Sequence, residues 1–324
     1  MPILYPSGER AAYVGIHYLY PLLGIGIWGI FAFIGQKKAL ARTFFIALPC
    51  YVVVLFAHFN IKLWIPHINP VLYDGLYWEI DQIFRPLVDV CIFIRENLTA
   101  IIPYETNLYM IGYIAMFYGS FSYHALRTPE KFSELVIAAL LLQCIGTIGY
   151  LVAPAIGPFI YEEGVNPMVT GGQHSMLEFY RHSLAGGSDW LVQNGGRSFT
   201  GGLAAMPSLH SAAAFLFLAF AWKHGRILVP LYAFLTAFIF VTAVATRWHY
   251  LIDIPFGVLV AWVGLFVAFF FLLSTRRALA ALPGLVAIRR TSRWWALAII
   301  SASRSRASWR LASCVRKRDA WMTI

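Results

Sequence analysis

The sequence predicts an all-α integral membrane protein with about seven transmembrane helices. Of its 324 residues, 60% are hydrophobic and 12% are charged, and the mean hydropathy is +0.67. In ordinary soluble domains about 25% of the residues are charged. Apolar segments of the roughly 20 residues that a helix needs to cross a bilayer recur along the chain. Basic residues mark alternate connections between these segments, and together the observations exclude an ordinary soluble fold.

Seven segments have the length and composition of membrane spans. They cover residues 11–35, 43–66, 107–126, 134–153, 208–223, 227–246 and 250–273. Three short connections between them contain the basic residues Lys37, Lys38, Arg42, Arg127, Lys131, Lys223 and Arg226. Lys and Arg in short loops stay on the cytoplasmic side. We therefore expect the segments 67–106 and 154–207 on the outer, periplasmic or lumenal, face and the C-terminus in the cytoplasm.

The C-terminal tail, residues 274–324, differs in composition from the polytopic membrane domain that we expect over residues 1–273. The tail contains eleven Lys and Arg residues and one acid, Asp319, which equals the whole net charge of +10. Tryptophans lie between its basic residues, as is typical of a segment attracted to anionic lipids. A tail that only sets the topology is an alternative. Its charge indicates the membrane surface as partner and not nucleic acid.

The two outer segments have different patterns. In 67–106, apolar residues recur every three or four positions and are interrupted by Asp74, Asp81, Arg85 and Asp89. This periodicity predicts an amphipathic helix on the outer interface, and its acids are either general bases or a solvated helix face. Segment 154–207 begins with prolines and glycines that end a span. We expect it to form a long loop that covers a site at the membrane surface.

Two histidine motifs lie at predicted outer helix ends. His210 closes the run Met206-Pro-Ser-Leu-His, and His249 precedes Asp253 by four residues. In a helix this spacing places both side chains on one face, where the carboxylate orients the imidazole. Antiparallel neighbouring helices would bring the two motifs together. Zinc bound by His210, His249 and Asp253 is an alternative use of the same atoms.

Such a constellation suits phosphoryl transfer at the headgroup level of a lipid. His249 is the candidate nucleophile, because Asp253 can hold one ring nitrogen as N–H, and His210 is the candidate general acid and base. Ser208 and the amides after Pro207 open a helix whose N-terminus favours phosphate. Arg247 is a candidate phosphate clamp, and Arg197 in the outer segment is a second.

These motifs resemble the second and third signature motifs of the type 2 phosphatidic acid phosphatase superfamily. The run from Tyr150 to Pro158, and Arg247 two residues before His249, look more like the branch that contains inositol phosphorylceramide synthases. Leu209 stands where classical phosphatases have glycine, and Ala243 stands where they have arginine. The first motif of the phosphatases is absent, and these departures favour the synthase-like branch.

The resemblance implies a six-helix catalytic core that begins before residue 107, with no cofactor and no metal. It implies that His249 forms a phosphohistidine. It also implies that His210 protonates the leaving group and afterwards removes a proton from the acceptor. The partners would be a phospholipid donor, such as a phosphoinositide, and a ceramide-like lipid acceptor in the membrane. A lipid phosphate phosphatase, with water as acceptor, is one alternative. A lipid transporter or scramblase, whose intramembrane polar residues line a path, is another.

Overall fold

The computed structural model describes residues 1–7, 20–35, 37–101, 105–201, 203 and 206–280. Every regular element in these residues is helical, so the all-α prediction is confirmed. The chain forms two compact units, Met1–Phe269 and Phe270–Ile324. Only the end of the last helix is described in the second unit, and the basic residues predicted as a cytoplasmic tail lie almost entirely outside the described part.

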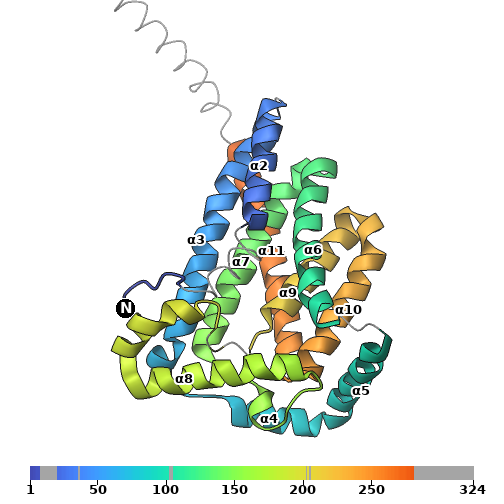
Figure 1. The fold of residues 1–324 in the computed structure, drawn as a ribbon. Helices are drawn as coiled ribbons and strands as arrows, with labels where there is room; N and C mark the ends of the chain where they lie inside the picture. The colour runs from blue at the N-terminus through green and yellow to red at the C-terminus, as the bar shows by residue number, and fades with distance from the viewer. Residues whose placement is uncertain (8–19, 36, 102–104, 202, 204–205, 281–324) are drawn as a thin grey trace, which may run out of the picture. The chain divides into compact units, whose positions relative to one another are not determined.

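Seven helices correspond to the seven predicted spans (Figure 1). They are α2 (Tyr20–Ile34), α3 (Lys38–Ile68), α6 (Glu105–Arg127), α7 (Pro129–Val152), α9 (Leu209–His224), α10 (Val229–Ala245) and α11 (Asp253–Ala280). Prolines help to set their starts: Pro129, Pro230 and Pro255 all lie in first turns. Proline suits the first turn because its missing N–H would have no helical partner there.

Four of the described helices are long and apolar enough to cross a membrane, over Leu40–Ile68, Pro129–Val152, Arg226–Ala245 and Asp253–Thr275. Large apolar side chains are exposed along two of them, for example Leu231, Phe234, Leu259 and Trp262. Such a surface is suited to lipid, and the protein is an integral membrane protein. The count of seven spans stays a prediction, because α9 has only 16 residues and the first predicted span begins in residues that are not described.

Segment 67–106 is helical in most of its described residues, as its periodicity predicts, whereas segment 154–207 is more ordered than the loop expected for it. Segment 67–106 contains two helices, α4 (Asp74–Ile83) and α5 (Arg85–Ile101), separated at Phe84. Segment 154–207 is not an irregular loop, since it contains the 28-residue helix α8 (Pro167–Asn194). Asn166 caps α8 by accepting bonds from the N–H groups of Met168 and Val169. In Figure 1, α4, α5 and α8 gather at the end of α3 and α7 that lies away from α2.

The α8 helix was missed because its sequence carries little helical signal. Four glycines, Gly171, Gly172, Gly186 and Gly187, interrupt it, and glycine has low helix propensity. At Gly187 the φ angle is 67°, so the helix is broken by a kink. Tertiary contacts therefore hold α8 in place, including the bond from Gln173 Nε2 to the carbonyl oxygen of Thr246 at 2.7 Å.

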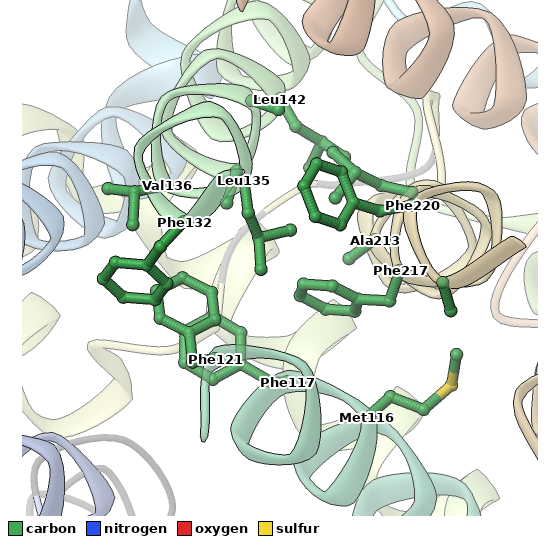
Figure 2. Packing of buried hydrophobic residues seen from close by; sticks show 14 of the residues in the cluster. Met116, Phe117, Phe121, Phe132, Leu135, Val136, Leu142, Ala213, Phe217 and Phe220 are labelled. Carbon is green, nitrogen blue, oxygen red and sulfur yellow. The ribbon is translucent and has the colours of Figure 1, made fainter. Parts of the chain in front are cut away.

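The main core lies between α6, α7 and α9 (Figure 2). Phe117 stacks on Phe121 at 4.6 Å between ring centroids and meets Phe217 edge-on at 5.8 Å. Phe121 in turn meets Phe132 of α7 at 5.8 Å. In a bilayer, lipid tails are as apolar as these side chains, so close packing rather than exclusion of water holds the helices together.

Glycine allows the starts of α9 and α11 to touch. A Cβ atom added at Gly257 would lie 2.7 Å from the carbonyl oxygen of Ser208 and 3.4 Å from the nitrogen of Ala212. The N–H of Ser208 donates to the carbonyl oxygen of Asp253 at 3.2 Å, which directly joins the two helix starts. Gly257, four residues after Asp253, therefore determines how closely the two histidine motifs approach.

We expect Gly257→Ala to destabilise the protein by about 1–3 kcal/mol, because the new methyl group meets rigid backbone and forces α9 and α11 apart. The check is the thermal unfolding midpoint of the purified protein in detergent. Gly171→Ala is the matched control, since a Cβ atom at Gly171 has no neighbour within 4 Å and alanine favours the helix by about 0.5–1 kcal/mol. Equal midpoints for the two variants would contradict the packing argument.

Candidate active site

His210 and His249 line the same cavity, which has a volume of about 900 Å³. His210 is the second residue of α9, and His249 lies in the connection between α10 and α11. The structure thus brings the two motifs together across 39 positions of sequence. Much of the remaining lining is apolar or aromatic and comes from α3, α6, α7, α8 and α10.

His249 is held by Asp253. Its Nδ1 lies 3.0 Å from Oδ2 of Asp253, and the same oxygen accepts the N–H of Tyr250 at 2.9 Å. Asp253 is fully buried and His249 is 8% exposed. Nδ1 is bound to the carboxylate, so Nε2 is the ring nitrogen that lies away from Asp253.

The two residues do not share a helix, as the spacing argument assumed. The helix α11 begins at Asp253, and His249 belongs to the preceding turn. Pro255 explains the difference, because a helix that continued back through residue 249 would place its ring against the carbonyl of Leu251. The loop nevertheless returns His249 to the carboxylate four residues ahead.

Two tyrosines of α6 flank the other histidine. The ring of Tyr113 meets the His210 ring edge-on at 4.6 Å and 90°, and Tyr109 meets it at 5.6 Å and 71°. These contacts restrict the rotation of the imidazole, so the orientation of His210 in the cavity depends on α6 as well as on α9.

Ser208 joins the motifs instead of lining the cavity. Its hydroxyl donates to Oγ of Ser211 at 3.0 Å, and the residue is fully buried. The predicted clamp Arg247 is also fully buried and has a φ angle of 57°. Arg197, in the short 3₁₀ helix η3 (Gly195–Ser198), is exposed. None of the three predicted phosphate-binding residues lines the cavity.

Arg247 points to α4 and to Glu162 for a clear physical reason. Its Nη2 donates to Oδ2 of Asp81 at 3.0 Å, its Nε lies 3.5 Å from Glu162, and its guanidinium stands 5.6 Å from the centre of the Trp78 ring. A buried guanidinium needs a carboxylate partner. The phosphate contacts expected of Arg247, Ser208 and Arg197 remain predictions that this geometry does not support.

The sequence analysis missed two cations that do line the cavity, Lys62 of α3 and Arg95 of α5. Arg95 is fully buried, and its Nη1 donates to Oγ1 of Thr242 at 2.9 Å. A lysine within the predicted span 43–66 is itself a signal, because ionisable residues in spans are costly and face protein interiors. Arg95 gave no such signal, since it lies in an amphipathic segment with several charges.

Of the alternatives for the acids of segment 67–106, a solvated helix face does not describe Asp74 and Asp81, which are buried in α4, and neither of them lines the cavity. Asp74 is 3% exposed and accepts the N–H groups of Ile156 and Gly157 and the hydroxyl of Tyr250, the last at 2.7 Å. Asp81 is fully buried and accepts the N–H of Leu251 at 2.8 Å. Both carboxylates thus hold the connection that carries His249.

Opposing effects act on the pKa of the Asp81 carboxyl. Burial raises the pKa of its carboxyl above the usual value, while the bonds from the Leu251 N–H and from Arg247 act in the opposite direction. Glu162 continues the network, because Arg85 binds it through two nitrogens at 2.6 and 2.7 Å. That pairing lowers the pKa of Glu162. Asp89, by contrast, is exposed and pairs with Arg85, one helical turn earlier.

The zinc alternative gains no support from the described residues. Among them, no group of three or more His, Cys, Asp or Glu side chains is placed to hold a metal ion. His249 is instead hydrogen-bonded to Asp253, and His210 lines the same cavity as His249.

Replacing Asp81 by asparagine should leave Arg247 buried without its main counter-charge. We expect Asp81→Asn to cost about 3–5 kcal/mol of stability, measured as a lower thermal unfolding midpoint in detergent. Glu79→Gln on the exposed side of α4 is the control and should change stability by less than about 0.5 kcal/mol. An unchanged midpoint for Asp81→Asn would refute the role of Asp81 in holding the connection.

Comparison with known proteins identifies the helical core. A model of the PAP2 superfamily matches residues 95–267, which is just over half of the chain. Neither the curated proteins nor the solved structures contain a match. The matched residues include both histidine motifs and α6 to α10, whereas α3 and α4 precede them. This match supports a lipid phosphatase or phosphotransferase type of activity, and the chain belongs to the PAP2 superfamily.

Proposed function

We propose that this protein transfers a phosphoryl-headgroup unit from a phospholipid to a lipid acceptor through a phosphohistidine intermediate. The observation that carries the proposal is the pairing of His249 Nδ1 with Asp253 at 3.0 Å in a cavity that His210 also lines. The resemblance of the Tyr150–Pro158 run to synthases favours phosphoinositol as the unit and a ceramide-like lipid as the acceptor.

In the first step, His249 Nε2 attacks the phosphorus of the donor. The phosphorus–nitrogen bond forms as the bond to the diacylglycerol oxygen breaks, and His210 donates a proton to that oxygen. Asp253 keeps the proton on Nδ1 and stabilises the positive charge that develops on the imidazole. The products of this step are diacylglycerol and a phosphoinositol group on His249.

In the second step, His210 removes the proton from the acceptor hydroxyl. The acceptor oxygen attacks phosphorus, the phosphorus–nitrogen bond breaks, and His249 regains its starting form with Asp253. Water in place of the lipid hydroxyl would make the same site a phosphatase. The apolar lining from Leu55, Phe59, Met176 and Phe179 is suited to lipid chains and favours a lipid acceptor.

We infer from the distribution of basic residues that this site lies on the outer face of the membrane. The same distribution indicates that the membrane domain ends near residue 273. The contacts of Asp74 and Asp81 suit this arrangement, because they place α4 beside the connection that carries His249. In this location the site would take lipid from the outer leaflet.

His249→Ala should reduce turnover more than about 10³-fold, and Asp253→Asn should reduce it about 10²- to 10⁴-fold through the wrong imidazole tautomer. His210→Ala should be similarly impaired. Lipid turnover by the purified protein in vesicles is the measurement, with intact mass spectrometry to detect the adduct on wild type. His182→Ala on the exposed side of α8 is the control. Full turnover by His249→Ala would refute the proposal. Loss of wild-type activity in the presence of a chelator would favour the zinc alternative.

The acceptor is identified by supplying phosphatidylinositol with and without ceramide and analysing the lipids by mass spectrometry. We expect a new inositol-phosphate sphingolipid only when ceramide is present. Release of phosphoinositol or inorganic phosphate at equal rates in both samples would mean that water is the acceptor. Lipid movement between leaflets without any turnover would contradict both reactions and favour a scramblase.

A further inference from the structure

Lys62 lies in an unusual place for a lysine. It belongs to the apolar helix α3, yet its side chain lines the cavity that holds His210 and His249. His58, one helical turn earlier, lines the same cavity. The α3 helix precedes residues 95–267, so both side chains lie outside the segment that matches the superfamily.

Contacts with α7 fix this face of α3. Nδ1 of His58 lies 2.7 Å from Oγ1 of Thr147, and the Thr147 hydroxyl in turn donates to the carbonyl oxygen of Gln143 at 2.6 Å. The ring of Tyr150 stands 5.7 Å from the His58 ring, and the Lys62 ammonium lies 5.9 Å from the centre of the Tyr150 ring. Lys62 therefore has a defined position relative to α7.

The same helix fixes the position of His210. A Cβ atom at Gly146 would overlap the side chain of Leu209, and one at Gly149 would lie 2.6 Å from Pro207, so α7 packs directly on the motif that contains His210. Gly146 and Gly149 alternate along α7 with Thr147 and Tyr150. Lys62 and His210 are thus both held by one short stretch of α7, through neighbouring faces of the helix.

Charge in the cavity is one-sided. Its described lining contains Lys62, Arg95 and three histidines, but no aspartate or glutamate. Among the described residues, no carboxylate lies within salt-bridge distance of the Lys62 ammonium; its one recorded partner is the Tyr150 ring. A buried charge is costly unless it is paired. An anion inside the cavity would complete the pairing.

We infer that Lys62 binds the phosphoryl oxygens of the anionic lipid donor, so that α3 supplies a phosphate-binding cation to the site. This inference rests on the proposed function. A lysine serves as a point charge for phosphate, and its charge offsets the negative charge on the equatorial oxygens during transfer. The neutral hydroxyl acceptor gains nothing from this contact, so Lys62 discriminates the donor from the acceptor.

The test measures donor and acceptor kinetics separately for the full-length protein in vesicles. Lys62→Met should lower kcat/KM for phosphatidylinositol about 10- to 150-fold, the range for losing a charged hydrogen bond, and should leave the KM for ceramide within about twofold. Lys62→Arg keeps the charge and should recover most of the activity. Lys38→Met, an exposed lysine of the same helix, should behave as wild type.

A second readout does not require turnover. Inorganic phosphate should raise the thermal unfolding midpoint of wild type, of Lys38→Met and of His249→Ala, but not that of Lys62→Met. An unchanged kcat/KM for phosphatidylinositol and an unchanged phosphate effect in Lys62→Met would overturn the inference while leaving the histidine mechanism intact. Full turnover in His249→Ala would overturn the mechanism instead, and the phosphate effect would still decide the role of Lys62. If Lys62→Met does not fold, Lys62→Gln takes its place in both measurements.

Discussion

Asp253 is the residue on which the arrangement of the site depends. Its side chain accepts bonds from His249 and from the Tyr250 N–H, and its carbonyl oxygen accepts the Ser208 N–H at the start of α9. One buried residue thus orients His249, shapes the turn before α11 and joins the two helix starts. Because these bonds lie in a region without bulk water, each unmade bond would carry a full desolvation cost.

A second layer of contacts holds the connection before Asp253. Asp74 and Asp81 of α4 bind Tyr250, Leu251 and Arg247, and Glu162 links Arg247 to Arg85. Most of this layer comes from residues that precede the segment matched by the superfamily. The part of the chain before the matched segment is therefore integral to the site: α4 supports it from one side, and α3 contributes Lys62 to the cavity.

This arrangement separates the acidic side chains from the basic ones. The carboxylates of Asp74, Asp81 and Glu162 are bound to backbone amides and arginines around the connection, whereas Lys62 and Arg95 line the cavity. The cations of the cavity favour an anion, and the apolar rest of its lining favours lipid chains. This combination is what an enzyme for phospholipids needs, because both ends of its substrate must be accommodated.

The sequence by itself determined the helical membrane class, the approximate positions of the long helices and the pairing of His249 with Asp253, because hydropathy and spacing are local properties of the chain. Even there, the pairing arises in a turn and not in the helix that its spacing suggested, since Pro255 makes α11 begin at Asp253. Only the tertiary structure decided which polar side chains face the cavity. Arg247 turns to Asp81, 166 positions away, while Lys62 and Arg95 enter from other helices. Such contacts depend on how helices pack, and no local pattern in the sequence records them.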